Sequence, residues 1–258
     1  MFFRFCFAVF LCLFITLEAA ADTLIVAVAS NFAGTLQKLA DRFKETSGHE
    51  VLISSASTGK IYAQIKNGAP FDIFMSADEA HVDKLVREGQ LEASPTAIYA
   101  IGKLVFISNL PAAGRCQDVL ADAKLGHVAI ANPQSAPYGM AAQQVMQYLG
   151  VWDKLQSKLV VGENIAQTLQ FVASTSADAG FVAKAGLMGE TAVARACEWE
   201  VPADLHTPLS QKMGVLKSAK NKPAVRAFWQ FMQSVEASTI IRDGGYDLPA
   251  SLKGKTGH

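Results

Sequence analysis

The feature that most constrains the fold of this chain is a repeated alternation of short apolar runs with helical patterns. Residues 24–28 and 51–54 are runs of the length and character of strands buried in a parallel sheet. Between them, apolar residues recur at helical spacing from Leu36 to Phe43, and Gly48 ends the pattern. Further strands are expected at 71–75, 104–108, 128–131, 159–161, 179–183 and 213–216. Helices are expected after Ser57-Thr58-Gly59, closing at Asn67-Gly68, and at 78–89, 138–149, 165–172 and 223–241. This alternation predicts an α/β fold.

The strands and helices fall into two comparable blocks, which predicts two doubly wound α/β lobes. We expect residues 22–105 to form the first part of lobe 1 and residues 106–208 to form lobe 2. The C-terminal helix has no sheet of its own, so residues 209–258 are expected to return to lobe 1. A chain that crosses twice between lobes forms a two-strand hinge beside a cleft.

The first 21 residues have the pattern of a signal peptide. Arg4 gives a short positive segment, residues 5–17 are apolar, and Ala19 to Ala21 supply small residues for cleavage near Ala21. The apolar run is shorter than the roughly 20 residues of a membrane-spanning helix, and an uncleaved anchor is the alternative. The pattern predicts an exported, periplasmic protein.

The charge balance excludes one broad class of function. The chain has 23 Lys and Arg against 23 Asp and Glu, a formal net charge of zero. A general nucleic-acid binder needs clustered basic residues to displace counterions, so we expect no nucleic-acid partner.

Two cysteines remain after the expected cleavage, Cys116 and Cys197. In an exported protein an even pair indicates a disulfide, with two buried thiols as the alternative. There is no C-x-x-C motif and the five histidines are scattered, so no metal site formed by direct side-chain ligation is expected.

Catalytic motifs such as G-x-S-x-G, G-x-G-x-x-G and H-E-x-x-H are absent from the sequence, and no catalytic residue is expected. Small or polar residues instead follow four strands where helices begin: Ser30-Asn31, Ser57-Thr58, Tyr138-Gly139 and Asn164-Ile165. Ligands of open α/β sheets bind at these strand ends, where unpaired N–H groups favour an anion. Each junction alone could be an ordinary N-cap worth about 1 kcal/mol. Four of them, with export and two lobes, favour an anion site.

Four motifs resemble those of the periplasmic molybdate-binding proteins of ABC-type uptake systems, along the whole mature length. They are Val26-Ala-Val-Ala-Ser-Asn-Phe32, Ser55-Ala-Ser-Thr-Gly59, Asn67-Gly-Ala-Pro-Phe-Asp-Ile-Phe-Met-Ser-Ala-Asp78 and Ala131-Asn-Pro-Gln-Ser-Ala-Pro-Tyr-Gly139. The resemblance implies the type II periplasmic binding protein fold, closing on one tetrahedral oxyanion.

The resemblance also implies the oxyanion-binding residues, which are Ser30, Asn31, Thr58, Tyr138 and Ile165. Thr58 keeps a hydroxyl where the family has Ser, and Ile165 offers only its backbone N–H. Ala183 stands where some members have a binding Tyr, so Tyr138 is the candidate source of the phenol.

The function implied is capture of molybdate, and of tungstate, for an inner-membrane ABC permease, by a monomer without a cofactor. Molybdate is fully deprotonated at neutral pH and only accepts hydrogen bonds, which suits a site of donors unless Glu163 turns inward. A receptor for sulfate or another oxyanion is the nearest alternative. An exported enzyme using Asp72, Asp78 or Cys197 is a more distant one.

Overall fold

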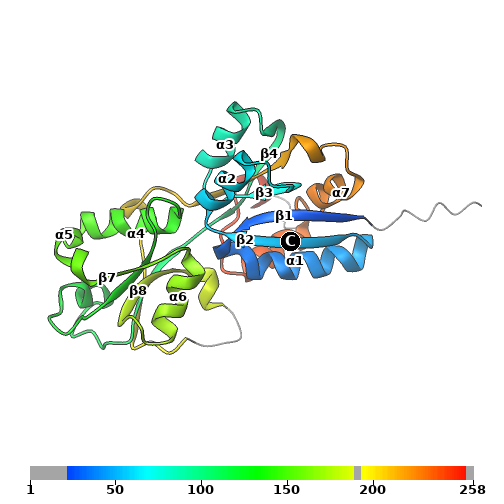
Figure 1. The fold of residues 1–258 in the computed structure, drawn as a ribbon. Helices are drawn as coiled ribbons and strands as arrows, with labels where there is room; N and C mark the ends of the chain where they lie inside the picture. The colour runs from blue at the N-terminus through cyan, green and yellow to red at the C-terminus, as the bar shows by residue number, and fades with distance from the viewer. Residues whose placement is uncertain (1–21, 189–192, 254–258) are drawn as a thin grey trace, which may run out of the picture.

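The computed structural model describes residues 22–188 and 193–253, so the expected signal peptide at residues 1–21 lies outside the described residues. In the described ranges, the strands form two five-stranded sheets that lie side by side (Figure 1). No helix in these ranges combines the length and the hydropathy needed to cross a membrane.

The first sheet has the order β2-β1-β3-β10-β4 and the second β7-β6-β8-β5-β9. The strands of the first are β1 (Thr23–Ala29), β2 (Glu50–Ala56), β3 (Ile73–Met75), β4 (Leu91–Ile101) and β10 (Ser210–Leu216). The strands of the second are β5 (Leu104–Ser108), β6 (Val128–Ala131), β7 (Leu159–Gly162), β8 (Ala179–Ala183) and β9 (Cys197–Glu200).

Both sheets are mixed, rather than parallel throughout. In the first, β1 pairs in parallel with β2 and β3, while β10 runs antiparallel between β3 and β4. In the second, β6 pairs in parallel with β7 and β8, while β5 runs antiparallel between β8 and β9. The parallel strands bring their carboxyl ends to one edge of each sheet, where ligands bind in such folds.

The chain passes between the sheets twice. It leaves β4 and enters β5 across residues 102–103, and it returns from β9 to β10 across residues 201–209. The Gly102 N–H donates to the Leu209 carbonyl at 2.9 Å, which joins the two crossings. The boundary that the sequence places after residue 105 falls inside β5, so the sheet changes earlier than expected. We propose that each sheet with its helices forms one lobe and that the crossings are the hinge.

The helices cover the sheets and frame the strand ends. The described α-helices are α1 (Ala33–Ser47), α2 (Thr58–Lys66), α3 (Ala80–Arg87), α4 (Pro137–Tyr148), α5 (Trp152–Leu155), α6 (Ile165–Ala173), α7 (Pro223–Phe231), α8 (Val235–Asp243) and α9 (Ala250–Lys253). The single C-terminal helix expected at 223–241 is wrong. It is divided into α7 and α8, because the Ser234 side chain caps a new helix by accepting from the Ala237 N–H at 3.0 Å. Val225 and Phe228 of α7 pack in the same core cluster as Leu24 and Val26 of β1.

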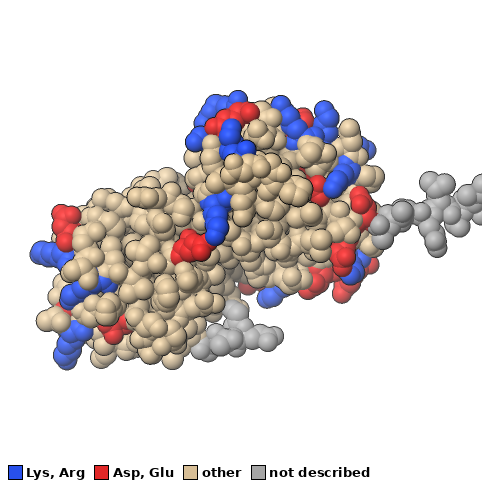
Figure 2. All heavy atoms as spheres, viewed as in Figure 1, with Lys and Arg blue, Asp and Glu red and all other residues tan. Residues whose placement is uncertain are grey.

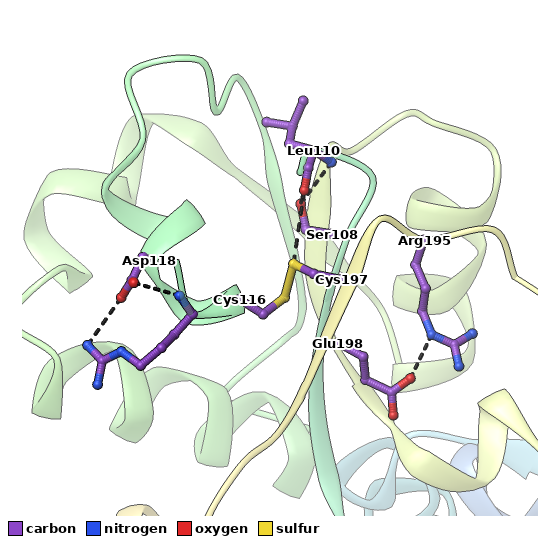
Figure 3. Close-up of a disulfide and its surroundings, with 8 residues drawn as sticks. Ser108, Leu110, Cys116, Asp118, Arg195, Cys197 and Glu198 are labelled. Carbon is purple, nitrogen blue, oxygen red and sulfur yellow. Dashed lines mark hydrogen bonds and ion pairs between the residues drawn. A yellow bond between two sulfur atoms is a disulfide. The ribbon is translucent and has the colours of Figure 1, made fainter. Parts of the chain in front are cut away.

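A disulfide joins Cys116 and Cys197, whose Cα atoms lie 5.6 Å apart. The structure therefore confirms the disulfide, and not the alternative of two buried thiols. Cys116 begins the short 3₁₀ helix η2 (Cys116–Ala121) and Cys197 begins β9, the edge strand of the second sheet (Figure 3). The bridge fastens this edge strand to a segment 81 residues earlier in the chain.

Candidate functional site

The four strand-to-helix junctions meet around one small cavity between the sheets. It leaves about 10 Å³ for the centre of a water-sized group, so it suits a small compact ligand. The lining residues are Ala29, Ser30, Asn31, Ser57, Thr58, Ala77, Ala136, Pro137, Tyr138 and Ile165. All five residues expected at the site are therefore brought together.

At the first junction, β1 runs into the 3₁₀ turn η1 (Ser30–Phe32) and then α1, without a side-chain cap at either start. The side chain of Asn31 turns into the protein. Its Nδ2 donates to Gln211 Oε1 at 2.9 Å and to Tyr246 Oη at 3.2 Å, and Tyr246 Oη donates to the Asn31 carbonyl at 2.6 Å. The amide of Asn31 thus braces the turn, and its backbone N–H is the group left for a ligand.

At the second junction, Thr58 is buried at the first position of α2. Its Oγ1 accepts a hydrogen bond from the Ala77 N–H at 3.1 Å. Because this bond occupies a lone pair of the hydroxyl, the hydroxyl proton remains available to donate. Ser57 precedes the helix in an extended conformation, but its side chain forms no cap.

At the third junction, Pro137 opens α4 and Tyr138 is only 1% exposed. Gly139 lets this helix start lie against β6, because a Cβ there would be 2.2 Å from the Ala131 carbonyl oxygen. Gln211 Nε2 donates to Tyr138 Oη at 3.4 Å, which orients the phenol to use its own proton as a donor elsewhere. A Cβ at Gly102 would lie 2.2 Å from the same Oη, so the crossing passes directly beside the phenol.

At the fourth junction, Asn164 is an ordinary N-cap, accepting from the Ala166 and Gln167 N–H groups at 3.0 and 3.1 Å. Ile165 begins α6 and its N–H is not among the capped groups. Glu163 does not turn inward: its carboxylate pairs with Lys60 of α2 at 2.5 Å, between the two lobes. Of the four junctions, only this one has the side-chain cap that an ordinary helix start would have.

The electrostatics of the cavity come from dipoles and neutral hydroxyls. Tyr138 is the one ionisable residue among those that line it. Burial, together with the neighbouring Tyr246, raises the pKa of Tyr138 well above 10, so its phenol stays protonated. Lys, Arg, Asp and Glu are scattered over the outer surfaces of both lobes on the face in Figure 2. In the described ranges no group of His, Cys, Asp and Glu side chains is placed to hold a metal ion.

A buried hydrogen-bond network lies behind the cavity, and the sequence does not predict it. Gln211 is fully buried and accepts from Asn31 Nδ2 and from Tyr99 Oη, both at 2.9 Å, while its own amide donates to Tyr138. Tyr246 completes the network through Asn31. The partners lie up to 215 residues apart, and no local pattern marks them. Ala183, where the resemblance leads one to look for a phenol, does not line this cavity.

Two mixed β-sheets, each with its helices, and a polar cavity between their strand ends are the features of the class of periplasmic binding proteins. The sequence model of the family described as bacterial extracellular solute-binding protein matches residues 24–247. This chain belongs to that family.

Its relatives include the molybdate-binding protein ModA of Azotobacter vinelandii, 40% identical over 89% of this chain and 92% of the relative. The molybdate-binding protein ModA of Rhodobacter capsulatus is also 40% identical, over 90% of this chain and 91% of the relative. The solved structure of the periplasmic molybdate-binding protein of A. vinelandii superimposes with a TM-score of 0.83 at 41% identity, covering 88% of this chain and 99% of that one. The resemblance seen in the four sequence motifs is confirmed.

Proposed function

We propose that this protein captures molybdate, and tungstate, in the cavity between its two sheets. The observation that carries the proposal is a small cavity whose polar lining consists of hydroxyl, phenol and helix N-terminal groups, without a carboxylate. Relatives 40% identical to it are molybdate-binding proteins, which supports the choice of anion.

The proposed donors are the five residues inferred from the sequence. Thr58 and Tyr138 each have a lone pair engaged inside the protein and a proton left to give. Ser30, Asn31 and Ile165 lie at helix starts, where backbone N–H groups are unpaired and the helix dipole is positive. A tetrahedral dianion that only accepts hydrogen bonds matches a set that only donates them.

The proposed mechanism is closure of the lobes about the crossings at 102–103 and 201–209. Ser30 and Thr58 belong to the first lobe and Tyr138 and Ile165 to the second, so one anion binds both and stabilises the closed form. Gly59 N–H already donates to the Ser135 carbonyl of the other lobe at 2.8 Å. No bond of the anion is made or broken, and the protein acts as a receptor, not as an enzyme.

We further propose that the protein works as a periplasmic monomer that delivers its anion to an ABC permease, without a cofactor. The expected signal peptide supports the location, as does the periplasmic relative from A. vinelandii. The enzymatic alternative is disfavoured by where its residues lie. Asp72 pairs with Lys222 at 2.8 Å, Asp78 with His81 at 2.8 Å, and Cys197 is in the disulfide.

The test is calorimetric titration of the purified protein with molybdate, tungstate, sulfate and phosphate at one pH and salt concentration. We expect tight binding of molybdate and tungstate and at least tenfold weaker binding of the other two. Tight sulfate binding without a molybdate response would refute the proposal and favour the sulfate receptor. Elemental analysis for molybdenum and tungsten in protein purified without added anion is an independent check.

A further inference from the structure

One buried hydroxyl group at the cavity makes no hydrogen bond to the described part of the protein. Ser57 is 3% exposed and lines the cavity beside Thr58. Its Oγ has no hydrogen-bond partner among the residues that the structure describes. A buried polar group without a partner costs about 1–3 kcal/mol, so such groups are uncommon in folded proteins.

The local geometry explains why this hydroxyl is left over. Ser57 has N-cap geometry, with φ −68° and ψ 151°, and its carbonyl accepts from the Ile61 N–H at 3.0 Å. A serine at this position normally accepts from the second or third N–H of the helix. The second belongs to Gly59, and it donates to the Ser135 carbonyl of the other lobe instead.

The same contact is sterically tight. A Cβ at Gly59 would lie 3.1 Å from both the Cα and the carbonyl oxygen of Ser135. Only a glycine lets the two lobes meet there without displacement, and the contact engages one of the two N–H groups, those of Gly59 and Lys60, from which an N-cap serine accepts. The helix start thus has an interlobe hydrogen bond and no side-chain cap, and a residue that lines the cavity keeps a buried hydroxyl without a partner among the described residues.

We propose that the Ser57 hydroxyl is a further donor to the bound oxyanion, in addition to the five residues named above. This inference rests on the proposed function and extends it at the same site. Thr58 is held in place by the Ala77 N–H, whereas Ser57 can rotate its hydroxyl to the anion without breaking a bond inside the protein. The second junction then offers two adjacent hydroxyls to one anion.

The experiment compares Ser57→Ala with wild type by calorimetric titration with sodium molybdate, and it measures thermal unfolding of each protein without anion. Ser55→Ala is the matched control, because Ser55 is exposed on β2, two residues away. We expect Ser57→Ala to raise the Kd by about tenfold to 150-fold, the range for losing a hydrogen bond to a charged group. We expect Ser55→Ala to bind as wild type does.

Thermal unfolding separates a donor from a helix cap. A donor without a protein partner predicts that anion-free Ser57→Ala melts at the wild-type temperature or above, since a desolvated hydroxyl is removed. A lower melting temperature with an unchanged Kd would assign Ser57 to helix capping and overturn the inference. A Kd within twofold of wild type overturns it whatever the melting temperature is.

The inference and the proposed function fail in different ways. If wild type binds molybdate and Ser57→Ala binds equally well, only the inference falls. If wild type binds sulfate or another tetrahedral oxyanion instead, the proposed function falls, and the titrations with that anion decide the role of Ser57. If wild type binds none of them, both are overturned.

Discussion

Replacing Tyr138 with Phe tests whether its phenol donates a hydrogen bond to the anion. The change removes one oxygen from a residue that is 1% exposed and alters no other heavy atom, so we expect the fold to be unchanged. A lost hydrogen bond to a charged group is worth about 1.5–3 kcal/mol, which raises the Kd for molybdate about tenfold to 150-fold. Gln211 Nε2 also loses an acceptor, but that bond is long, 3.4 Å, and its loss adds little to the unfolding free energy.

The assay is calorimetric titration with molybdate, with anion-free thermal unfolding as the measure of fold stability. Tyr148→Phe is the matched control, because Tyr148 ends the same helix, α4, with 71% of its surface exposed. We expect the control to bind as wild type does and Tyr138→Phe to melt within a few degrees of it. An unchanged affinity of Tyr138→Phe would remove the phenol from the donor set and refute the assignment of Tyr138 as a donor.

Three other perturbations have defined outcomes. Gly102→Ala places a Cβ 2.2 Å from Tyr138 Oη, so titration should show at least tenfold weaker molybdate binding; wild-type affinity would contradict the packing described for the crossing. Glu163→Gln breaks the ion pair with Lys60. Because both side chains of the pair are about half exposed, the Kd for molybdate should change less than fivefold, and the change should vanish in 1 M salt. A larger, salt-independent effect would mean that Glu163 acts on the anion. Because burial raises the pKa of Tyr138 well above 10, the phenol keeps its proton below that pH, and the Kd should be flat from pH 7 to 9 in titrations at fixed salt; affinity falling with a midpoint inside that range would show an ionising donor.

The parts of the fold predicted correctly depend on local patterns. Strands such as β1 and β6 are continuous apolar runs, and the sequence predicts them directly. The strand β4 is missed because Glu92, Ser94 and Pro95 interrupt its apolar character, and β9 because Glu198 and Glu200 alternate with its apolar residues. The break between α7 and α8 depends on one serine acting as a cap, which composition alone does not reveal.

The candidate site also has one part that the sequence predicts and another that it does not. The four junctions follow from strand ends and small polar residues, so their convergence on one cavity could be predicted. The roles of the side chains could not. The side-chain amide of Asn31 is hydrogen-bonded to Gln211, which is 180 residues distant, and the Gly59 N–H beside Ser57 is hydrogen-bonded to Ser135 in the other lobe. Both outcomes depend on contacts between segments that no sequence spacing relates.

The position of β10 has a consequence for the order in which the protein assembles. Strand β4 pairs with β10 alone in its sheet, and β10 comprises residues 210–216, after the whole second sheet in the chain. A chain made from its N-terminus therefore holds β4 without a partner until residues 210–216 of 258 have been added. The sheet whose strands are made first is the one completed last. For that interval β3 and β4 both present open strand edges of the kind that pairs between chains, and Glu92 and Pro95 in β4 are residue types that hinder such pairing.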